Sequence, residues 1–378
     1  MMRDMERVIS LHTPAAPSCC GSRKRTQASP PRLDQPFVTG RVQTPVGQVP
    51  RVSQVLGLAD RLGAFKARWG IGRMRYTIDA ALYALGDAGP ESPVCVTANY
   101  KMSFDLLRRA LTGMDAWILV LDTQGINVWC AAGKGTFGTD ELVDRIESSG
   151  LADVVSHRRL IVPQLGAPGV AAHEVRRRSG FQVVYGPVRA DDLPAFLKGG
   201  LKASGRMRTK DFGFMERLAL VPMEVVPAVK AALPAAAALF VLALLLSGLS
   251  ASKALDWTLV ALVAMGSSIL AGAVFTPLLL PWLPGRAFSA KGLGVGLLSA
   301  LAVLPLTGTV HHLATAGTLA LLVSIPAMSA YLAMSFTGSS TFTSLSGVRK
   351  EMRFALPLEI GGTASGVALW LVAILTGG

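Results

Sequence analysis

Charged residues are scarce in this 378-residue sequence, at 16% Asp, Glu, Lys and Arg against roughly 25% in soluble domains. The shortage is concentrated in the C-terminal part, where only seven basic and three acidic residues follow position 227. The first 227 residues carry 30 basic and 21 acidic groups. The sequence therefore predicts a polar part followed by an apolar, membrane-embedded part.

Cysteine is also rare. The four cysteines, Cys19, Cys20, Cys95 and Cys130, lack the spacing of a zinc site or of a ferredoxin-type cluster. The N-terminus has no apolar run of the length that a signal peptide needs. These features favour a reducing, cytoplasmic setting for the polar part, with at least one thiol kept for chemistry.

Basic residues outnumber acidic ones, and the net charge is +13. Such an excess suits nucleic acid, anionic ligands or an anionic membrane surface. No helix-turn-helix or aromatic RNA-binding strand pattern accompanies it, so we expect no nucleic-acid partner. A basic domain held beside an anionic lipid leaflet is the preferred interpretation.

Composition divides the chain into four regions. Residues 1–50 are rich in Pro, Ser, Thr and Arg without periodicity, and we expect a disordered leader there. Residues 51–200 are predicted to form an α/β domain, and residues 201–227 a basic linker. Residues 228–378 are predicted to form an all-α transmembrane domain with five helices.

The predicted α/β domain starts with helix-compatible sequence over residues 52–85, followed by short apolar runs that alternate with amphipathic segments. This alternation predicts a Rossmann-like sheet covered on both faces, with ligands beyond the carboxyl ends of its strands. Strands are expected at 94–98, 117–121, 126–129, 160–162 and 181–185, and helices at 104–111, 139–146 and 170–178.

Five apolar stretches are each near the 20 or so residues that span a bilayer core. Basic residues lie before the first stretch, between the second and third, and between the fourth and fifth. This pattern puts the polar domain in the cytoplasm and the C-terminus outside, as a multi-pass protein of the inner membrane. The stretches are 231–249, 257–283, 292–310, 313–336 and 354–376.

The predicted spans contain one charged residue, Glu359. Transporters and proton pumps usually need several ionisable groups at mid-membrane. An anchor and docking platform is therefore the preferred role of this region, and a transporter is the alternative.

Cys130 lies in the segment that is the best candidate for a reactive or metal-binding site. It stands between an expected strand and the small residues Ala131, Ala132 and Gly133. Small residues let a flat or bulky group approach the backbone, and a thiolate suits a soft metal. A phosphate loop does not fit, because Val128 and Gly135 occupy positions that require Gly and Ser or Thr. The residues alone leave two interpretations, a reactive or metal-binding thiol and an inert buried thiol.

The run Asn127-Val128-Trp129-Cys130-Ala131-Ala132-Gly133-Lys134-Gly135 resembles the signature of the HgcA family, the membrane-anchored corrinoid proteins of microbial mercury methylation. Further segments resemble the corrinoid domain of that family, which is related in kind to the corrinoid iron-sulfur proteins: Val96–Lys101, His157–Arg158, Pro163–Ala167 and Tyr185–Arg189. The resemblance runs from about Val52 to the end, including the five spans.

The resemblance implies a cobalamin or related corrinoid whose cobalt takes Cys130 as its lower axial ligand, so that Cys130 is the catalytic residue. The Asp-x-His-x-x-Gly motif of His-ligated corrinoid domains is missing, since Asp153 and His157 are four residues apart. The implied cofactor-binding residues are Asn127, Val128, Trp129, Cys130, Ala131, Ala132, Gly133, Lys134 and Gly135, with Thr97 and Asn99 at the end of a strand.

The activity implied by the resemblance is transfer of a methyl group from methyl–Co(III) corrinoid to Hg(II), forming methylmercury. The implied partners are a methyl-donor protein of the folate pathway, the ferredoxin-like iron-sulfur protein HgcB as electron donor, and the lipid bilayer. Two alternatives are a membrane-anchored methyl carrier for one-carbon metabolism and a membrane transporter with a cytoplasmic regulatory domain.

Overall fold

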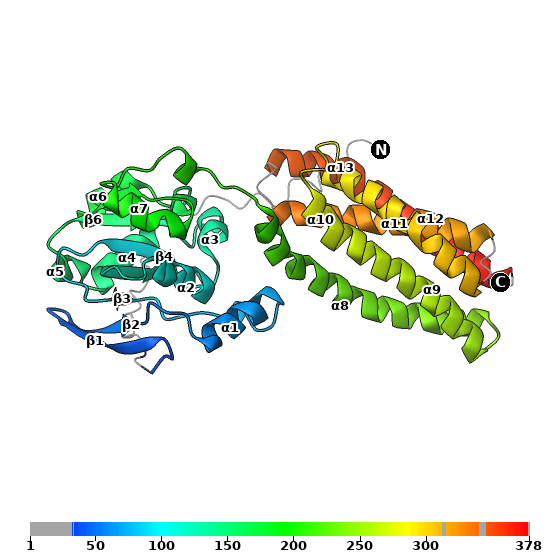
Figure 1. Cartoon of the computed structure of the whole chain (residues 1–378), viewed down its shortest axis with the longest axis horizontal. Helices are drawn as coiled ribbons and strands as arrows, with labels where there is room; N and C mark the ends of the chain where they lie inside the picture. Colours follow the sequence, from blue (N-terminus) through cyan, green and yellow to red (C-terminus); the bar gives the residue numbers. More distant parts are fainter. Residues whose placement is uncertain (1–31, 33, 312–314, 340–344, 377–378) are drawn as a thin grey trace, which may run out of the picture.

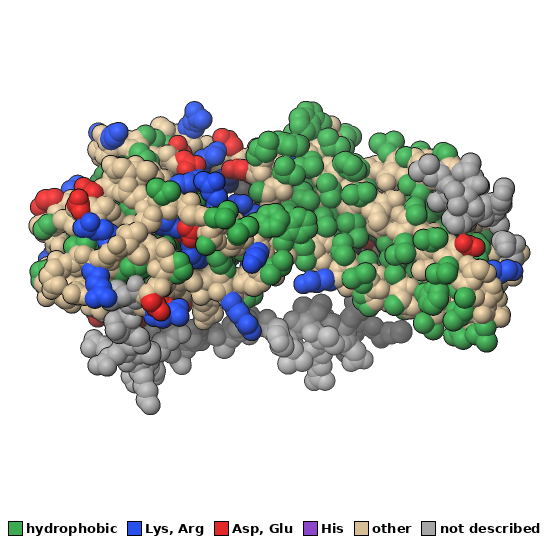
Figure 2. Space-filling view, turned by 60° about the horizontal axis from the view of Figure 1, so that its bottom comes forward, with side chains coloured by type: hydrophobic (Ala, Val, Ile, Leu, Met, Phe, Trp, Pro, Cys, Tyr) green, Lys and Arg blue, Asp and Glu red, His purple; other side chains and the backbone are tan. Residues whose placement is uncertain are grey.

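The computed structural model describes residues 32, 34–311, 315–339 and 345–376. An α/β domain with a seven-stranded sheet is followed by a domain of long helices (Figure 1). This arrangement confirms the predicted fold class. Figure 2 shows most of the charged side chains on the α/β domain, and hydrophobic side chains over much of the visible face of the helical domain.

The sheet has the strand order β1-β2-β3-β5-β4-β6-β7. Strands β5, β4, β6 and β7 are parallel to one another, whereas β3 runs antiparallel to β5 and β1 antiparallel to β2. Every residue of β4 and β5 is buried, as expected for parallel strands covered on both faces. The bounds are β1 Val38–Thr44, β2 Gly47–Val52, β3 Leu82–Leu85, β4 Val94–Ala98, β5 Ala116–Leu121, β6 Arg159–Val162 and β7 Gln182–Tyr185.

Helices cover both faces of the sheet. Apolar side chains of α2 (Lys101–Ala110) and α7 (Leu193–Lys198), including Phe104 and Phe196, form the core on one face. The other face is covered by α3 (Val128–Lys134), α4 (Thr139–Ser148), α5 (Leu151–Val154) and α6 (Ala172–Ser179). Helix α1 (Leu58–Arg68) lies beside the sheet domain, next to the helical domain (Figure 1).

Three local predictions were wrong. Residues 38–50 do not belong to a disordered leader, because they form β1 and most of β2. The hairpin was missed because β1 alternates half-buried and exposed residues with little apolar content. Leu82–Leu85 is a buried strand rather than part of a helix, and residues 128 and 129 begin α3 rather than end a strand. Residues 1–31 of the expected leader lie outside the described residues.

The described residues contain five helical segments that are long and apolar enough to cross a membrane. These segments correspond to the five predicted stretches, although α8 already begins at Phe214, inside the expected linker. The helices are α8 Phe214–Leu246, α9 Ala251–Ile269 with the π-helical Leu270–Phe275 and α10 Thr276–Leu279, α11 Phe288–His311, α12 Thr315–Ser335 and α13 Leu345–Leu375.

Glycines allow the apolar helices to approach closely around Ser329. A Cβ atom at Gly272 would lie 2.5 Å from the Ser329 carbonyl oxygen, and one at Gly292 would lie 2.6 Å from the same atom. Close packing of this kind, through small residues, is the usual way in which membrane helices associate.

Candidate functional site

The site is built at the edge of the sheet where the parallel strands end. Helix α3 lies across this edge, in contact with β4 and with the short 3-10 segment Gln164–Gly166 that follows β6. Figure 1 shows α3 on the side of the α/β domain that faces the helical domain. Ligands of open parallel sheets bind at this edge.

Both ends of α3 are fixed by local sequence. Asn127 is extended (φ −65°, ψ 159°), and its Oδ1 accepts a hydrogen bond from the Cys130 backbone N–H at 2.9 Å. This bond is a side-chain N-cap. Gly135, with φ 80°, ends the helix in the left-handed region that glycine adopts without strain. Cys130 is therefore held in the first turn of a capped helix.

The two faces of α3 differ sharply. Val128, Ala131 and Ala132 point into the core, at the i, i+3 and i+4 spacing of one helix face. The opposite face exposes Trp129, which is 45% accessible, and Cys130. Gly133, Lys134 and Gly135 are exposed as well, and no atom lies within 4 Å of the position of a Cβ at Gly133. The thiol thus stands on an open surface that can accept a flat ligand.

Asn99 positions the loop that leads into α3. Its Oδ1 accepts hydrogen bonds from Thr123 N at 3.1 Å, Thr123 Oγ1 at 2.9 Å and Gly125 N at 3.0 Å. Its Nδ2 donates to Asp122 Oδ1 at 3.0 Å. Asn99 is 8% exposed, so the structure gives it a positioning role behind the loop.

Thr97 is 4% exposed and lies within β4, opposite Val120 of β5. It therefore has little surface to offer a ligand. The structure brings Asn99 close to the start of α3 through the loop after β5, whereas Thr97 stays inside the sheet.

The two described thiols have opposite environments. Cys95 is 1% exposed in β4, and burial raises the pKa of its thiol to about 12. Cys130 is exposed. A buried thiol of raised pKa is poorly reactive, so Cys130 is the accessible nucleophile or ligand of the pair. Cys19 and Cys20 lie outside the described residues.

A buried ion cluster near the site was not predicted. The Lys101 ammonium lies 2.6 Å from Asp60 and 2.8 Å from Asp105, and the Arg108 guanidinium lies 2.7 Å from Asp60 and 2.9 Å from Asp105. The cluster ties α1 to α2. Its part within α2 has i, i+3 and i+4 spacing that the sequence could have revealed, but the link to Asp60 depends on tertiary structure.

Burial disfavours the charged form of Asp60, but the hydrogen bonds and charges of Lys101 and Arg108 outweigh it. The net effect is to lower the pKa of the Asp60 carboxyl. The carboxylate is therefore stabilised in the folded protein, where it anchors α1.

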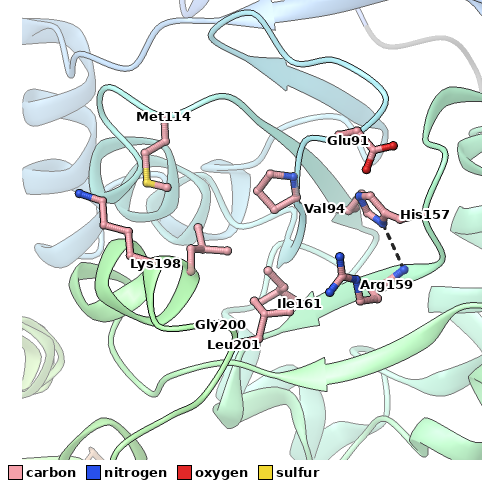
Figure 3. A pocket seen from close by; sticks show the side chains of 11 residues that line it. Glu91, Val94, Met114, His157, Arg159, Ile161, Lys198, Gly200 and Leu201 are labelled. Carbon is pink, nitrogen blue, oxygen red and sulfur yellow. Dashed lines mark hydrogen bonds between the residues drawn. The ribbon is translucent and has the colours of Figure 1, made fainter.

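A cavity of about 410 Å³ lies at the opposite edge of the sheet, near the starts of β4 and β6 (Figure 3). His157 lines it, but both ring nitrogens are engaged, Nε2 with the Ser92 carbonyl at 2.9 Å and Nδ1 with the Arg159 N–H at 3.2 Å. These bonds give His157 a structural role. The cavity is separate from the edge that carries Cys130.

The described residues contain no group of three or more His, Cys, Asp and Glu side chains that could together hold a metal ion. Cys130 is thus a single potential protein ligand on an open face. A metal bound there needs further ligands from a macrocycle or from solvent.

The part of the chain that contains this site is similar to known proteins. The family model of the CO dehydrogenase/acetyl-CoA synthase delta subunit matches residues 73–197, about a third of the chain. This stretch includes Asn99, the loop after β5 and all of α3.

Two relatives are gamma subunits of acetyl-CoA decarbonylase/synthase complexes. The protein from Archaeoglobus fulgidus is 29% identical over 123 residues, and the one from Methanopyrus kandleri is 31% identical over 123 residues. Each alignment covers 32% of this chain and 26% of the relative, so the chain spans about a quarter of the length of these curated relatives. The similarity supports a corrinoid-protein-like domain within residues 73–197, followed by helices that the match does not cover.

Proposed function

We propose that this chain is a membrane-anchored, corrinoid-dependent methyltransferase that transfers a methyl group to Hg(II), with Cys130 as the lower axial ligand of the cobalt. One observation carries the proposal: an exposed thiol stands on the open face of a capped helix at the carboxyl edge of a parallel sheet. The similarity of residues 73–197 to subunits of acetyl-CoA decarbonylase/synthase supports a corrinoid and methyl transfer as the general chemistry.

The residues of α3 suit a corrin ring. Cys130 would hold the metal through Sγ, while the open space at Gly133 would leave room for the ring beside it. Asn127 and Asn99 would hold the helix and its preceding loop in place. When bound, the corrin would supply four nitrogen ligands and a cobalt-bound methyl group.

A sulfur ligand on the cobalt suits the transfer of a methyl group to Hg(II), because Hg(II) is an electrophile. A Cys130 thiolate would donate electron density to a bound cobalt, and this donation would favour transfer of a methyl group to Hg(II). The exposed position of Cys130 would let a corrin ring reach its thiol from solvent.

The membrane domain and the partners belong to the same proposal. The five apolar helices would anchor the chain in the inner membrane, with the α/β domain in the cytoplasm and the C-terminus outside. A methyl-donor protein of the folate pathway would supply the methyl group. The ferredoxin-like iron-sulfur protein HgcB would supply electrons, because the cysteines of this chain do not have the spacing of an iron-sulfur cluster.

The proposal is tested by measuring methylmercury formed by the full-length protein in lipid nanodiscs, loaded with methylcobalamin and given Hg(II). We expect turnover above the protein-free background, and a loss of at least about tenfold in Cys130→Ala, since one axial ligand is removed. Cys95→Ala, which changes the other described thiol, is the matched control and keeps the activity. Equal activity in Cys130→Ala and the wild type contradicts the proposal.

The similarity to acetyl-CoA decarbonylase/synthase subunits favours one second candidate, a membrane-anchored methyl carrier for one-carbon metabolism. It predicts the same dependence of the cofactor on Cys130. It differs in that the loaded protein forms no methylmercury above background.

A further inference from the structure

Helix α1 exposes a continuous apolar stripe to its surroundings. Leu58, Leu62 and Phe65 are 74%, 50% and 55% exposed, and Trp69 directly after the helix is 39% exposed. Their spacing of four, three and four residues places them on one side of the helix. The rings of Phe65 and Trp69 lie 5.9 Å apart, so the stripe forms one surface.

The other side of α1 is fixed to the α/β domain. Ala67 is fully buried, and Asp60 is held by Lys101 and Arg108 in the buried ion cluster. A Cβ at Gly63 would lie 2.6 Å from the Tyr76 ring, so the helix backbone packs directly on that ring. These contacts hold the apolar stripe outward.

Basic residues flank the stripe. Arg61 and Arg68 lie on one side of it and Lys66 on the other, as the 100° turn per residue dictates, and all three are exposed. The acidic residue of α1, Asp60, points into the ion cluster. The outer surface of α1 is therefore apolar along its centre and positively charged along both margins.

Helix α1 and the residues directly after it lie against α8, the helix that leads into the apolar domain. The Arg73 guanidinium contacts the Met223 thioether, and a Cβ at Gly70 would be in van der Waals contact with Val226, 3.7 Å away. Figure 1 shows α1 beside the first turns of α8. Met223 and Val226 precede Lys230, the last charge before the apolar run, by seven and four residues. At 1.5 Å per residue this is about 10 and 6 Å, the depth of a lipid headgroup layer.

We propose that α1 is an interfacial helix that lies on the anionic leaflet in which α8 is inserted, with its apolar stripe at the boundary between headgroups and acyl chains. An amphipathic helix with an apolar face, basic margins and exposed Phe and Trp has the composition of such helices. The inference rests on the proposed insertion of the five spans. It gives the α/β domain a second attachment to the bilayer, and thereby a fixed orientation of the edge that carries Cys130.

The test measures the depth of a fluorescent probe in the full-length protein. The probe is attached to Leu62→Cys in a background of Cys19→Ser, Cys20→Ser and Cys130→Ser, in nanodiscs of phosphatidylcholine and phosphatidylglycerol. Quenching is compared between lipids that carry a spin label near the headgroup end of the acyl chain and lipids that carry it near the chain terminus. Phe65→Cys is a second probe position on the same stripe.

Two further positions separate the possible failures. Ala237→Cys, exposed in α8 seven residues after Lys230, reports whether the span is inserted. Arg176→Cys, exposed on α6 at the far side of the α/β domain, reports the signal of a position in water.

We expect the probes at Leu62 and Phe65 to be quenched most by the shallow spin label, the probe at Ala237 by the deep one, and the probe at Arg176 by neither. Omitting phosphatidylglycerol should reduce the quenching at Leu62, because Arg61, Lys66 and Arg68 lose their anionic partners. Quenching at Ala237 without quenching at Leu62 and Phe65 overturns the inference alone and indicates that the stripe faces water or a protein. Equal quenching with and without phosphatidylglycerol overturns the preference for an anionic leaflet. No quenching at Ala237 overturns the membrane insertion on which the inference rests.

Discussion

Among single residues, Asn127 fixes the position of Cys130 in the first turn of α3. Its side chain accepts the Cys130 N–H, so the cap and the candidate ligand share one hydrogen bond. An N-cap contributes about 1 kcal/mol to the stability of a helix. Because α3 has seven residues, we expect the loss of the cap to lower the stability of the whole helix.

We predict that Asn127→Ala raises the rate of amide hydrogen exchange at Cys130 by about fivefold, the equivalent of about 1 kcal/mol of local stability. Asn127→Ser, which keeps a capping oxygen, serves as the control and should stay close to the wild type. Unchanged exchange in Asn127→Ala would mean that α3 is held by its packing on the sheet rather than by its cap.

Glu359 has an unusual environment among the residues of the helical domain. It is 5% exposed, and neither carboxylate oxygen has a hydrogen-bond partner in the part of the chain that the structure describes. An unsatisfied buried polar group costs roughly 1–3 kcal/mol. Glu351 on the same helix contrasts with it, because its carboxylate accepts the Ser289 N–H at 2.6 Å.

We therefore expect Glu359→Leu to stabilise the protein by roughly 1–3 kcal/mol in detergent unfolding experiments. Glu351→Leu is the matched change to a carboxylate with a partner, and it should destabilise the protein. A loss of stability in Glu359→Leu would show that this carboxylate has a ligand in the membrane and would favour the transporter alternative.

Of the site residues, Cys130 could be identified from the sequence, whereas the role of Asn99 could not. Cys130 and its neighbours stood out because the run from Asn127 to Gly135 resembles a known signature. The role of Asn99 as a clamp for the loop after β5 could not be predicted. Its four hydrogen bonds join residues that are 23 to 26 positions apart, so they depend on the order of β4 and β5 in the sheet.

At the scale of elements, α1 is joined to α2 by the ion cluster of Asp60, Lys101, Asp105 and Arg108. Because the pKa of Asp60 is lower in the folded protein than in the unfolded chain, its charge contributes stability above its unfolded pKa. This contribution is lost as the pH falls from the ordinary value of about 3.9 through the lower folded value.

We predict that acid destabilises the wild type more steeply than Asp60→Asn, measured by denaturant unfolding over roughly pH 2 to 7. Asp60→Asn itself should be less stable at pH 7, since Arg108 and Lys101 lose a buried partner. Asp191→Asn removes a surface ion pair with Arg109 and should leave the profile unchanged. Parallel acid profiles for Asp60→Asn and the wild type would contradict the role of the cluster.

Elements with a long apolar run or a strong hydrophobic period could be predicted from the sequence. Elements with little apolar content could not. The strands at 94–98 and 117–121 are buried apolar runs, and the structure has them at Val94–Ala98 and Ala116–Leu121. The β1–β2 hairpin is polar on one side and was hidden within the Pro- and Thr-rich start. The start of α3 was predicted as a strand because Val128 and Trp129 favour strands, and the cap at Asn127 overrides that preference.

In the whole molecule, a polar α/β domain is joined to five apolar helices, with α3 and α1 both on the side toward the helical domain (Figure 1). The division was predictable because charge density falls abruptly along the sequence. The boundary between the two domains was harder to predict. Helix α8 begins at Phe214 and includes charged residues of the expected linker, because backbone hydrogen bonding continues through a helix whether its side chains are apolar or charged.

A role of Cys130 as the cobalt ligand of a corrinoid held on α3 can be measured in the visible spectrum and cobalt content of the full-length protein reconstituted with cobalamin. We predict about one cobalt per chain and a thiolate-shifted spectrum in the wild type and in Cys95→Ala. The shift should be lost in Cys130→Ala. Identical spectra in the wild type and Cys130→Ala, or no bound cobalt in either, would show that Cys130 is not the ligand of a bound corrinoid.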